Sequence, residues 1–292
     1  MAGMNDILNI DRLPAMPAAL AKAIPLLLDP DSSWDALEKV LRQDESLTTA
    51  VLRLANSVLF GAPGKHFDLR GSMSRLGRDR LRRCVLEQQV STVVGGDNAA
   101  FGLQRGAMWR SALGGAIAAE ELARRHAPDE AGLAFICGLL RDIGKLALNV
   151  HFGDSYFAQV SRHEQTGVSF IEAERAGLGF DHAQVGAALA RKWRLPVRVA
   201  SAIERHHNPP APAGTDHDVL FDIVHAADVI CRWAGLDVGV DGMEYRLAEH
   251  VRTGLKLDRR SAETEIALVW DRLREAEAAL SAPAPAKQGV AA

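Results

Sequence analysis

Polar side chains interrupt otherwise apolar stretches in the second half of this chain. The set comprises Asp142, His182, His206, His207 and Asp228. Buried carboxylates and imidazoles are costly unless they are paired, hydrogen-bonded or bound to a metal, so these residues are expected to meet one another or an ion. Imidazole nitrogen and carboxylate oxygen suit Zn, Fe or Mn. Two ions held in this way can polarise a phosphate and generate hydroxide, so the set indicates hydrolytic chemistry.

Each member also has a plainer interpretation. Asp142 could cap or bridge neighbouring helices, and Asp228 could be a structural hydrogen-bond acceptor. His206 and His207 could simply complement the dipole at a helix end. Six further histidines show no partner in the pattern and are interpreted as surface or core residues: His126, His151, His163, His217, His225 and His250. The set as a whole is more specific than any member.

Arg141 stands next to Asp142 and changes the expected chemistry. A guanidinium is permanently cationic and has no lone pair for a metal. At about 4 Å it would repel a dication by several kcal/mol in a partly buried site. We expect the guanidinium to occupy the space of an ion and to pair with Asp142, Asp228 or both. Asp228 is the better partner, because adjacent residues on a helix do not face each other. The alternative is a weak anion site lined by Arg141, Lys145 and the histidines, which would need a cavity.

Composition places the chain among ordinary soluble globular proteins. Its 292 residues are 48% hydrophobic and 24% charged, with a net charge of −3 that gives no pull toward nucleic acid or an anionic membrane. No stretch approaches the roughly 18 apolar residues of a membrane helix, and no signal peptide is recognisable. Three widely spaced cysteines indicate reduced thiols. A cytoplasmic protein is expected.

Helical periodicity dominates, and no strand alternation is long enough to build a sheet. Helices are expected over about 18–28, 32–43, 44–58, 78–94, 109–122, 134–149, 157–166, 171–176, 182–192, 197–207, 219–233 and 258–280. Ser32 with Asp35 resembles a capping box, and Asp44 is a candidate N-cap. The arginines at 78, 80, 82 and 83 are expected to face outward.

The order of the motifs resembles the HDOD family, a divergent branch of the HD superfamily. The matching runs are Leu13–Pro17, Leu52–Gly61, Arg75–Gly77, Trp109–Ser111, Cys137–Leu146, Phe180–Ala187, Trp193–Pro196, His206–Pro209 and Ala226–Asp228. The resemblance covers about residues 10–235. It implies an all-α fold in which an N-terminal helical bundle packs on an HD-like helical core. The expected parts are 1–95 for the bundle, 96–235 for the core, 236–280 for a helical extension and 281–292 for a disordered tail.

The resemblance also implies which metal ligands are present. Asp142, His182, His206, His207 and Asp228 match ligand positions of catalytic HD proteins. Two histidines of that pattern are replaced, one by Ser111 and the other, in the His-Asp pair, by Arg141. The GYP signature of relatives that cleave cyclic dinucleotides is also missing. We therefore expect no catalytic residue, no metal and no cofactor, with Mn, Fe or Zn as the alternative.

The function expected from the resemblance is that of a non-catalytic regulator in a bacterial signal-transduction pathway, with other signalling proteins as partners. The arginines of 78–83 are a candidate docking surface. One alternative is a metal-dependent phosphohydrolase acting on a nucleotide. Another is a sensor that binds a nucleotide or other anion without turnover. Nucleic acid and membrane are not expected partners, and the sequence does not specify the oligomeric state.

Overall fold

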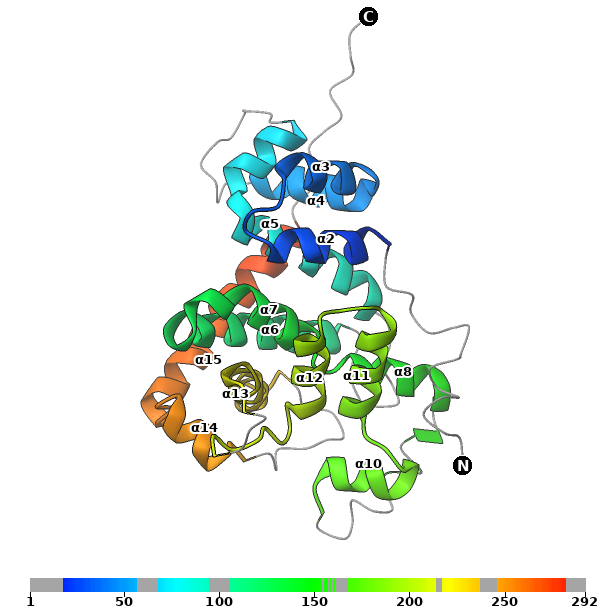
Figure 1. Ribbon diagram of the computed structural model, residues 1–292, viewed down its shortest axis with the longest axis vertical. Helices are drawn as coiled ribbons and strands as arrows, with labels where there is room; N and C mark the ends of the chain where they lie inside the picture. Colours follow the sequence, from blue (N-terminus) through cyan, green and yellow to red (C-terminus); the bar gives the residue numbers. More distant parts are fainter. Residues whose placement is uncertain are drawn as a thin grey trace, which may run out of the picture. The chain divides into compact units, whose positions relative to one another are not determined.

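The computed structural model describes residues 18–56, 68–94, 106–153, 155–156, 158, 160, 168–213, 217–236 and 246–281. All regular structure in these ranges is helical, which confirms the all-α prediction (Figure 1). Of the predicted helix 157–166, the structure describes only residues 158 and 160. The motif Leu13–Pro17 lies outside the described residues. Among the helices of the described ranges, none has the length and apolar character that crossing a bilayer requires.

Contacts divide the chain into two compact units. The larger unit contains residues 1–16 and 90–271, and the smaller unit contains 17–89 and 272–292. The helix α15 (Arg259–Ser281) contributes to both. The parts expected from the sequence, with a separate extension over 236–280, stay a prediction. The predicted tail lies almost wholly outside the described residues.

The smaller unit is built on the helices α2 (Ala18–Leu28), α3 (Trp34–Arg42), α4 (Glu45–Ala55) and the first part of α5 (Leu69–Val94). Its apolar core includes Leu37, Leu41, Leu47, Val51, Met73 and Leu81. Gly77 interrupts α5 with φ 71° and ψ 170°, a conformation that glycine adopts without a steric penalty. The predicted helix start at 78 is therefore correct, and a further helical segment precedes it.

The start of α3 differs from its prediction. Ser33, not Ser32, is the N-cap, and its hydroxyl accepts a hydrogen bond from the Asp35 backbone N–H at 3.2 Å. Ser32 instead donates to the Leu26 carbonyl. The predicted cap of α4 is confirmed, since the Asp44 carboxylate accepts from the Leu47 N–H at 3.0 Å.

Arg78 points into the smaller unit, so the prediction that it faces outward was wrong. Its guanidinium donates to the Ser32 hydroxyl at 2.7 Å, to the Ser32 carbonyl, and to the carbonyls of Leu26 and Asp29 at 3.4 and 3.3 Å. The end of α2 leaves carbonyls without intrahelical partners, and a guanidinium can satisfy several at once. Arg82 is also buried. Neither side chain is placed to form the expected docking surface.

Truncating Arg78 is expected to weaken the smaller unit. Because Arg78→Ala removes the donor of the Ser32 carbonyl and one of two donors to the carbonyls of Leu26 and Asp29, we expect a loss of about 1–3 kcal/mol in the free energy of unfolding. Urea denaturation measures it. The exposed neighbour Arg80 is the matched control, and Arg80→Ala is expected to change stability by less than about 0.5 kcal/mol. Equal effects of the two substitutions would contradict the role given to Arg78.

The larger unit contains the remaining helices. They are α6 (Ala107–His126), a short 3₁₀ turn η3 (Pro128–Glu130), α7 (Ala131–Leu140), α8 (Ile143–Phe152), α10 (Phe170–Leu178), α11 (His182–Lys192), α12 (Val197–Arg205), α13 (Val219–Trp233), α14 (Glu249–Gly254) and the first part of α15. The helix α6 packs against α7 and α13, and α11 packs against α8 and α12. The bounds of α11 and α13 agree with the predictions, whereas α14 was not predicted.

The predicted helix 134–149 is broken at the residues that matter most. The helix α7 ends at Leu140 and α8 begins at Ile143, with Asp142 as its N-cap residue at φ −98° and ψ 10°. Arg141 and Asp142 are therefore not successive residues of one helix. The turn between the helices buries both side chains in the interior.

Two glycines permit close approaches that position the interior polar groups. A Cβ at Gly138 of α7 would lie 2.4 Å from the Gly115 carbonyl of α6. A Cβ at Gly144 of α8 would lie 1.9 Å from the carbonyl of His182. No side chain fits at that distance, so Gly144 lets α8 lie against the start of α11 and brings His182 beside Asp142.

Candidate functional site

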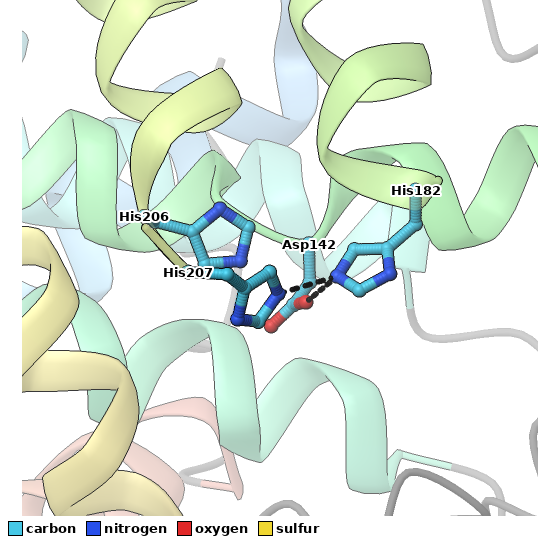
Figure 2. Close-up of side chains that lie close together, drawn as sticks. All are labelled: Asp142, His182, His206 and His207. Atoms are coloured by element: carbon cyan, nitrogen blue, oxygen red, sulfur yellow. Dashed lines mark hydrogen bonds and ion pairs between the residues drawn. The ribbon is translucent and has the colours of Figure 1, made fainter. Parts of the chain in front are cut away.

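The residues singled out in the sequence gather in the interior of the larger unit. Asp142, His182, His206 and His207 each offer one ligand atom, and these atoms lie within 4.8 Å of one another (Figure 2). They come from the junction of α7 and α8, the start of α11 and the end of α12. Asp228 of α13 lies beside them, with Oδ2 3.7 Å from Nδ1 of His207.

Arg141 is fully buried and contacts both carboxylates of this centre. Its Nε donates to Asp228 Oδ1 at 2.7 Å and lies 3.3 Å from Asp142 Oδ2. Its Nη2 donates to the Ser111 hydroxyl at 2.8 Å, and its Nη1 donates to the carbonyls of Ser111 and Gly138 at 3.0 Å each. The expected pair with Asp228 is confirmed. Moreover, Ser111 and Arg141, which the resemblance aligns with histidines of the HD pattern, bond to each other.

Gly115 provides the space for this guanidinium. A Cβ at Gly115 would lie 2.1 Å from Nη1 and 2.7 Å from Cζ of Arg141. Gly115 was not predicted from the sequence, although a glycine inside an apolar helical pattern is a signal of close packing. Ser111, Gly115, Gly138 and Asp228 together form a guanidinium socket around Arg141.

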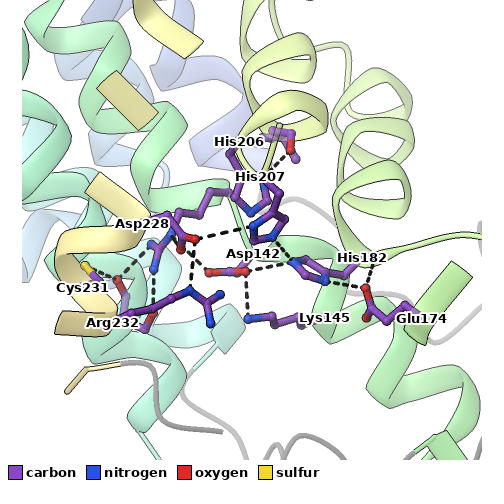
Figure 3. A network of polar contacts seen from close by, with 12 residues as sticks. Asp142, Lys145, Glu174, His182, His206, His207, Asp228, Cys231 and Arg232 are labelled. Atoms are coloured by element: carbon purple, nitrogen blue, oxygen red, sulfur yellow. Dashed lines mark hydrogen bonds and ion pairs between the residues drawn. The ribbon is translucent and has the colours of Figure 1, made fainter. Parts of the chain in front are cut away.

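A second arginine also faces Asp228. Arg232, one turn later on α13, donates from Nε to Asp228 Oδ2 at 3.2 Å (Figure 3). Burial alone would raise the pKa of Asp228, but the charges of Arg232 and Arg141 outweigh it and hold that pKa well below its usual range. Asp228 is therefore an anion at neutral pH, held between two cations.

Asp142 lies between the arginines and the histidines. Lys145 Nζ is 3.0 Å and His182 Nε2 is 3.4 Å from its Oδ1 (Figure 3). Burial would raise the pKa of Asp142, but Lys145 and Arg141 hold it well below its usual range. Although Asp142 is the N-cap residue of α8, its side chain makes no capping hydrogen bond, which removes the interpretation as a cap. Its contacts with Lys145 of α8 and His182 of α11 agree with the other plain interpretation, a bridge between neighbouring helices. Because Lys145 and Arg141 already face carboxylates, the geometry does not favour them as anion-binding residues.

His182 is oriented by Glu174 of α10, which sequence analysis also missed. Its Nδ1 lies 2.7 Å from Glu174 Oε2, and its backbone N–H donates to the same oxygen at 3.0 Å. The hydroxyl of Tyr156 donates to the other oxygen of Glu174. Burial alone would lower the pKa of His182, but Glu174 and Asp142 raise it to about 10. His182 is therefore an imidazolium at neutral pH.

His206 and His207 remain neutral. Burial lowers the pKa of His206 to about 4, and it lowers the pKa of His207 well below its usual range. The Nδ1 of His206 lies 2.6 Å from the Ile203 carbonyl and so carries the proton. Its Nε2 then holds a lone pair that has no hydrogen-bond partner among the described residues. His207 Nε2 lies 2.9 Å from His182 Nε2 and accepts the hydrogen bond that protonated His182 donates.

A centre with two metal ions does not fit these residues. The guanidinium of Arg141 bridges Asp142 and Asp228, where an ion shared by the two carboxylates would stand. The other part of the centre, here called the histidine half, does carry a donor set suited to one transition-metal ion. It consists of Asp142, His182, His206 and His207. The local charge, however, opposes binding of such an ion. The three carboxylates of the centre already face four cations, which are Arg141, Lys145, Arg232 and protonated His182. The carboxylates are those of Asp142, Glu174 and Asp228.

The raised pKa of His182 predicts how stability depends on pH. The proton stabilises the folded state fully below pH 6.5, the ordinary value, and this contribution is lost as the pH rises toward about 10. Over that window the expected slope is roughly −1.4 kcal/mol per pH unit. Urea denaturation between pH 7 and 10 measures it, with His182→Gln as the reference. A slope unchanged by His182→Gln would show that His182 does not hold the proton.

Comparison with known proteins identifies the family of this chain. The HDOD domain family matches residues 13–209, which is more than half of the chain. The chain belongs to the HDOD family. The matched range includes Arg141 and the polar residues up to His207, whereas Asp228 follows it. An uncharacterized protein of Treponema pallidum is 26% identical over 229 residues, which are 77% of this HDOD chain and 43% of that protein. The chain thus spans less than half the length of that curated relative.

Solved structures share the fold. An HDOD protein of unknown function from Geobacter sulfurreducens is 27% identical, with a TM-score of 0.66 over 94% of this chain and 93% of that one. A candidate phosphohydrolase from Shewanella amazonensis is 24% identical, with a TM-score of 0.63 over 91% and 100%. A candidate signal transduction protein from Marinobacter aquaeolei is 23% identical, with a TM-score of 0.69 over 94% and 59%. The last two comparisons support the fold alone.

Proposed function

We propose that this HDOD chain is a non-catalytic regulator that acts through contacts with other signalling proteins in a bacterial pathway. One observation carries the proposal. Arg141 and Ser111, which replace two histidines of the HD pattern, bond to each other and hold the guanidinium on Asp228. The protein thereby supplies its own fixed cation at the position of a metal.

This arrangement opposes metal-assisted hydrolysis. A catalytic ion needs protein ligands with lone pairs and an open position for water or substrate. Arg141 offers no lone pair, and its donors are directed at protein acceptors. The name of the Marinobacter relative, a candidate signal transduction protein, is consistent with a regulatory role. The relatives named above also come from bacteria.

Restoring the two histidines tests the proposal. The wild type is expected to bind no more Mn²⁺ or Fe²⁺ per chain than Asp142→Asn binds, and to leave p-nitrophenyl phosphate and nucleotides unhydrolysed. The double variant Ser111→His, Arg141→His is expected to gain Mn²⁺ binding, because it replaces the guanidinium by two imidazoles. Elemental analysis and a phosphatase assay measure both. Stoichiometric Mn²⁺ in the wild type, with turnover abolished by Asp142→Asn, would contradict the proposal.

A one-metal phosphohydrolase is the alternative that the histidine half favours. Asp142, His182, His206 and His207 would hold the ion, which would polarise a phosphate and activate water. The buried lone pair of His206 and the name of the Shewanella relative support this reading. It requires His182 to lose its proton. Turnover that disappears in His206→Gln would favour this enzyme over the regulator.

A third function, that of a sensor for a nucleotide or other anion, would use a pocket beside His207. Its volume is about 310 Å³, and its lining includes Arg175 and Arg246 together with Glu172, Asp181 and Glu204. Because Arg175 already pairs with Asp181, an anion would depend mainly on Arg246 and would face three carboxylates. Such a sensor would be stabilised by its ligand without turning it over. Thermal-shift measurements with nucleotides, including cyclic dinucleotides, test it. A shift that is lost in Arg246→Ala would support binding in this pocket.

A further inference from the structure

The segment 246–254, here called the latch segment, follows the range that matches the HDOD family and yet reaches the buried centre. It contains the non-helical residues 246–248 and the helix α14. Arg246 lines the pocket of about 310 Å³ that is also lined by His207 and Asn208. The latch segment therefore helps to enclose the pocket at which His207, whose side chain is only 8% exposed, meets solvent.

The helix α14 depends on its neighbours for stability. It spans only 6 residues, and isolated helices shorter than about 12 residues are marginal in water. Its N-cap residue, Ala248, provides no capping side chain. The helix packs on α13 and buries Val251. Contacts with α13 must therefore hold the latch segment in place.

His225 of α13 provides the first of these contacts. Its Nε2 accepts a hydrogen bond from the Ala248 N–H at 3.1 Å, and its Nδ1 lies 2.7 Å from the His206 carbonyl. Because a carbonyl only accepts, Nδ1 carries the proton and Nε2 keeps its lone pair. Burial lowers the pKa of His225, which favours this neutral form. One imidazole thus links the latch segment to the backbone of the buried centre.

An ion pair provides the second contact. His250 Nε2 of α14 lies 3.5 Å from Oδ1 of Asp222, whose side chain is only 6% exposed. The His250 side chain is 24% exposed and can exchange protons with solvent. Histidine ordinarily gains its positive charge as the pH falls from 8 to 5, whereas aspartate ordinarily keeps its negative charge over that range. The attraction between α14 and α13 at this point therefore grows as the pH falls.

The other groups on α14 and α13 near His250 do not replace this attraction. On α14, Glu249 pairs with Arg252 at 2.6 Å. On α13, His225 is neutral at neutral pH, and it offers no negative charge in either protonation state. The carboxylate of Asp222 is therefore the partner that distinguishes charged from neutral His250.

His217, which precedes α13, faces the other oxygen of the same carboxylate. Its Nε2 lies 2.9 Å from Asp222 Oδ2. Protonated His217 would weaken the pull of Asp222 on His250 without cancelling it, because Oδ1 is the atom next to His250. The neighbouring carboxylate of Asp218 pairs with Arg198 at 2.9 Å and so adds little charge.

We propose that the latch segment is held on α13 more firmly as the pH falls, and that its release at higher pH opens the pocket beside His207. The bond from Ala248 to His225 positions the segment, and the pair of His250 with Asp222 adds the contact that pH controls. This regulation concerns the pocket itself and does not depend on which of the functions proposed above is correct.

Amide hydrogen exchange of the full chain at two pH values tests the latch segment. At pH 5.5 the amides of residues 248–254 are expected to exchange about fivefold faster in His250→Gln than in the wild type, as for an ion pair worth about 1 kcal/mol. At pH 8 the two proteins are expected to exchange equally. Comparing proteins at one pH cancels the effect of pH on the chemistry of exchange and on the rest of the fold.

Two further variants complete this experiment. Asp222→Asn removes the other charge of the pair and is expected to match His250→Gln; should it fail to fold, His250→Gln at its partly exposed position carries the test alone. His126→Gln removes an exposed histidine elsewhere and is the control, with exchange like that of the wild type at both pH values. Equal exchange of the wild type and His250→Gln at pH 5.5, or the same difference at pH 8, would overturn the proposal.

Chemical modification of His207 tests the link to the pocket. Diethyl pyrocarbonate modifies accessible neutral imidazoles, and mass spectrometry locates the product. At pH 5.5 His207 is expected to react about fivefold faster in His250→Gln than in the wild type, in proportion to the release of the latch segment. His151 of α8 is the internal control, with equal reaction in both proteins. Equal modification of His207 in the two proteins would contradict control of the pocket by the latch segment.

Discussion

Arg141→Ala is expected to lower the free energy of unfolding by about 3–5 kcal/mol, the usual result of removing one partner from a buried ion pair. The substitution leaves the carboxylates of Asp228 and Asp142 in the interior without the cation that lies 2.7 and 3.3 Å from them. It also removes the hydrogen bond that the guanidinium donates to the Ser111 carbonyl at 3.0 Å. Urea denaturation at neutral pH measures the change.

An exposed ion pair supplies the control for Arg141. Arg191 pairs with Glu204, and both side chains are well exposed. Arg191→Ala is expected to cost at most about 1 kcal/mol, because solvent screens such pairs. If Arg141→Ala cost no more than Arg191→Ala, then Arg232 and Lys145 alone would satisfy the carboxylates, and the guanidinium would not replace an ion.

Gly115→Ala is expected to be the second most damaging substitution. The new Cβ would stand 2.1 Å from Nη1 of Arg141, so the guanidinium must leave its socket. Overpacking of this kind costs about 1–3 kcal/mol, and displacing the cation from Asp228 adds to it. Gly254→Ala is the matched control, because a Cβ at Gly254 meets nothing within 4 Å. That substitution is expected to be neutral or slightly stabilising.

The damage from Gly115→Ala is expected to depend on Arg141. Once Arg141→Ala has removed the guanidinium, the alanine at 115 has space, and the second substitution should cost little. The double-mutant cycle should therefore give a coupling energy of about 1–3 kcal/mol. Additive effects, within about 0.5 kcal/mol, would show that Gly115 serves the packing of α6 on α7 and not the socket.

The sequence was sufficient for the fold class and for the carboxylates and histidines that meet in the buried centre, but not for Gly115, Glu174 and Arg232. Asp142 and Asp228 stand out because an unpaired carboxylate does not persist in an apolar helix, so each required a partner. The pair of Arg141 with Asp228 was predictable for the same reason. These inferences need only residue types and their apolar surroundings, which a single sequence displays.

Long-range geometry was not predictable in this way. The break between α7 and α8 is hidden in a continuous apolar run, and it is the break that places Arg141 beside Asp142 as well as Asp228. Arg78 was expected at the surface because the carbonyls it binds belong to a distant segment. Glu174 was missed because nothing local indicates that it faces His182.

Diffraction from crystals grown with Mn²⁺ tests the central claim most directly. We expect no anomalous signal from manganese between Asp142 and Asp228, and we expect electron density for the Arg141 guanidinium at that position, with hydrogen bonds to Ser111 and Asp228. A manganese ion coordinated by both carboxylates, with Arg141 displaced from Ser111, would contradict it.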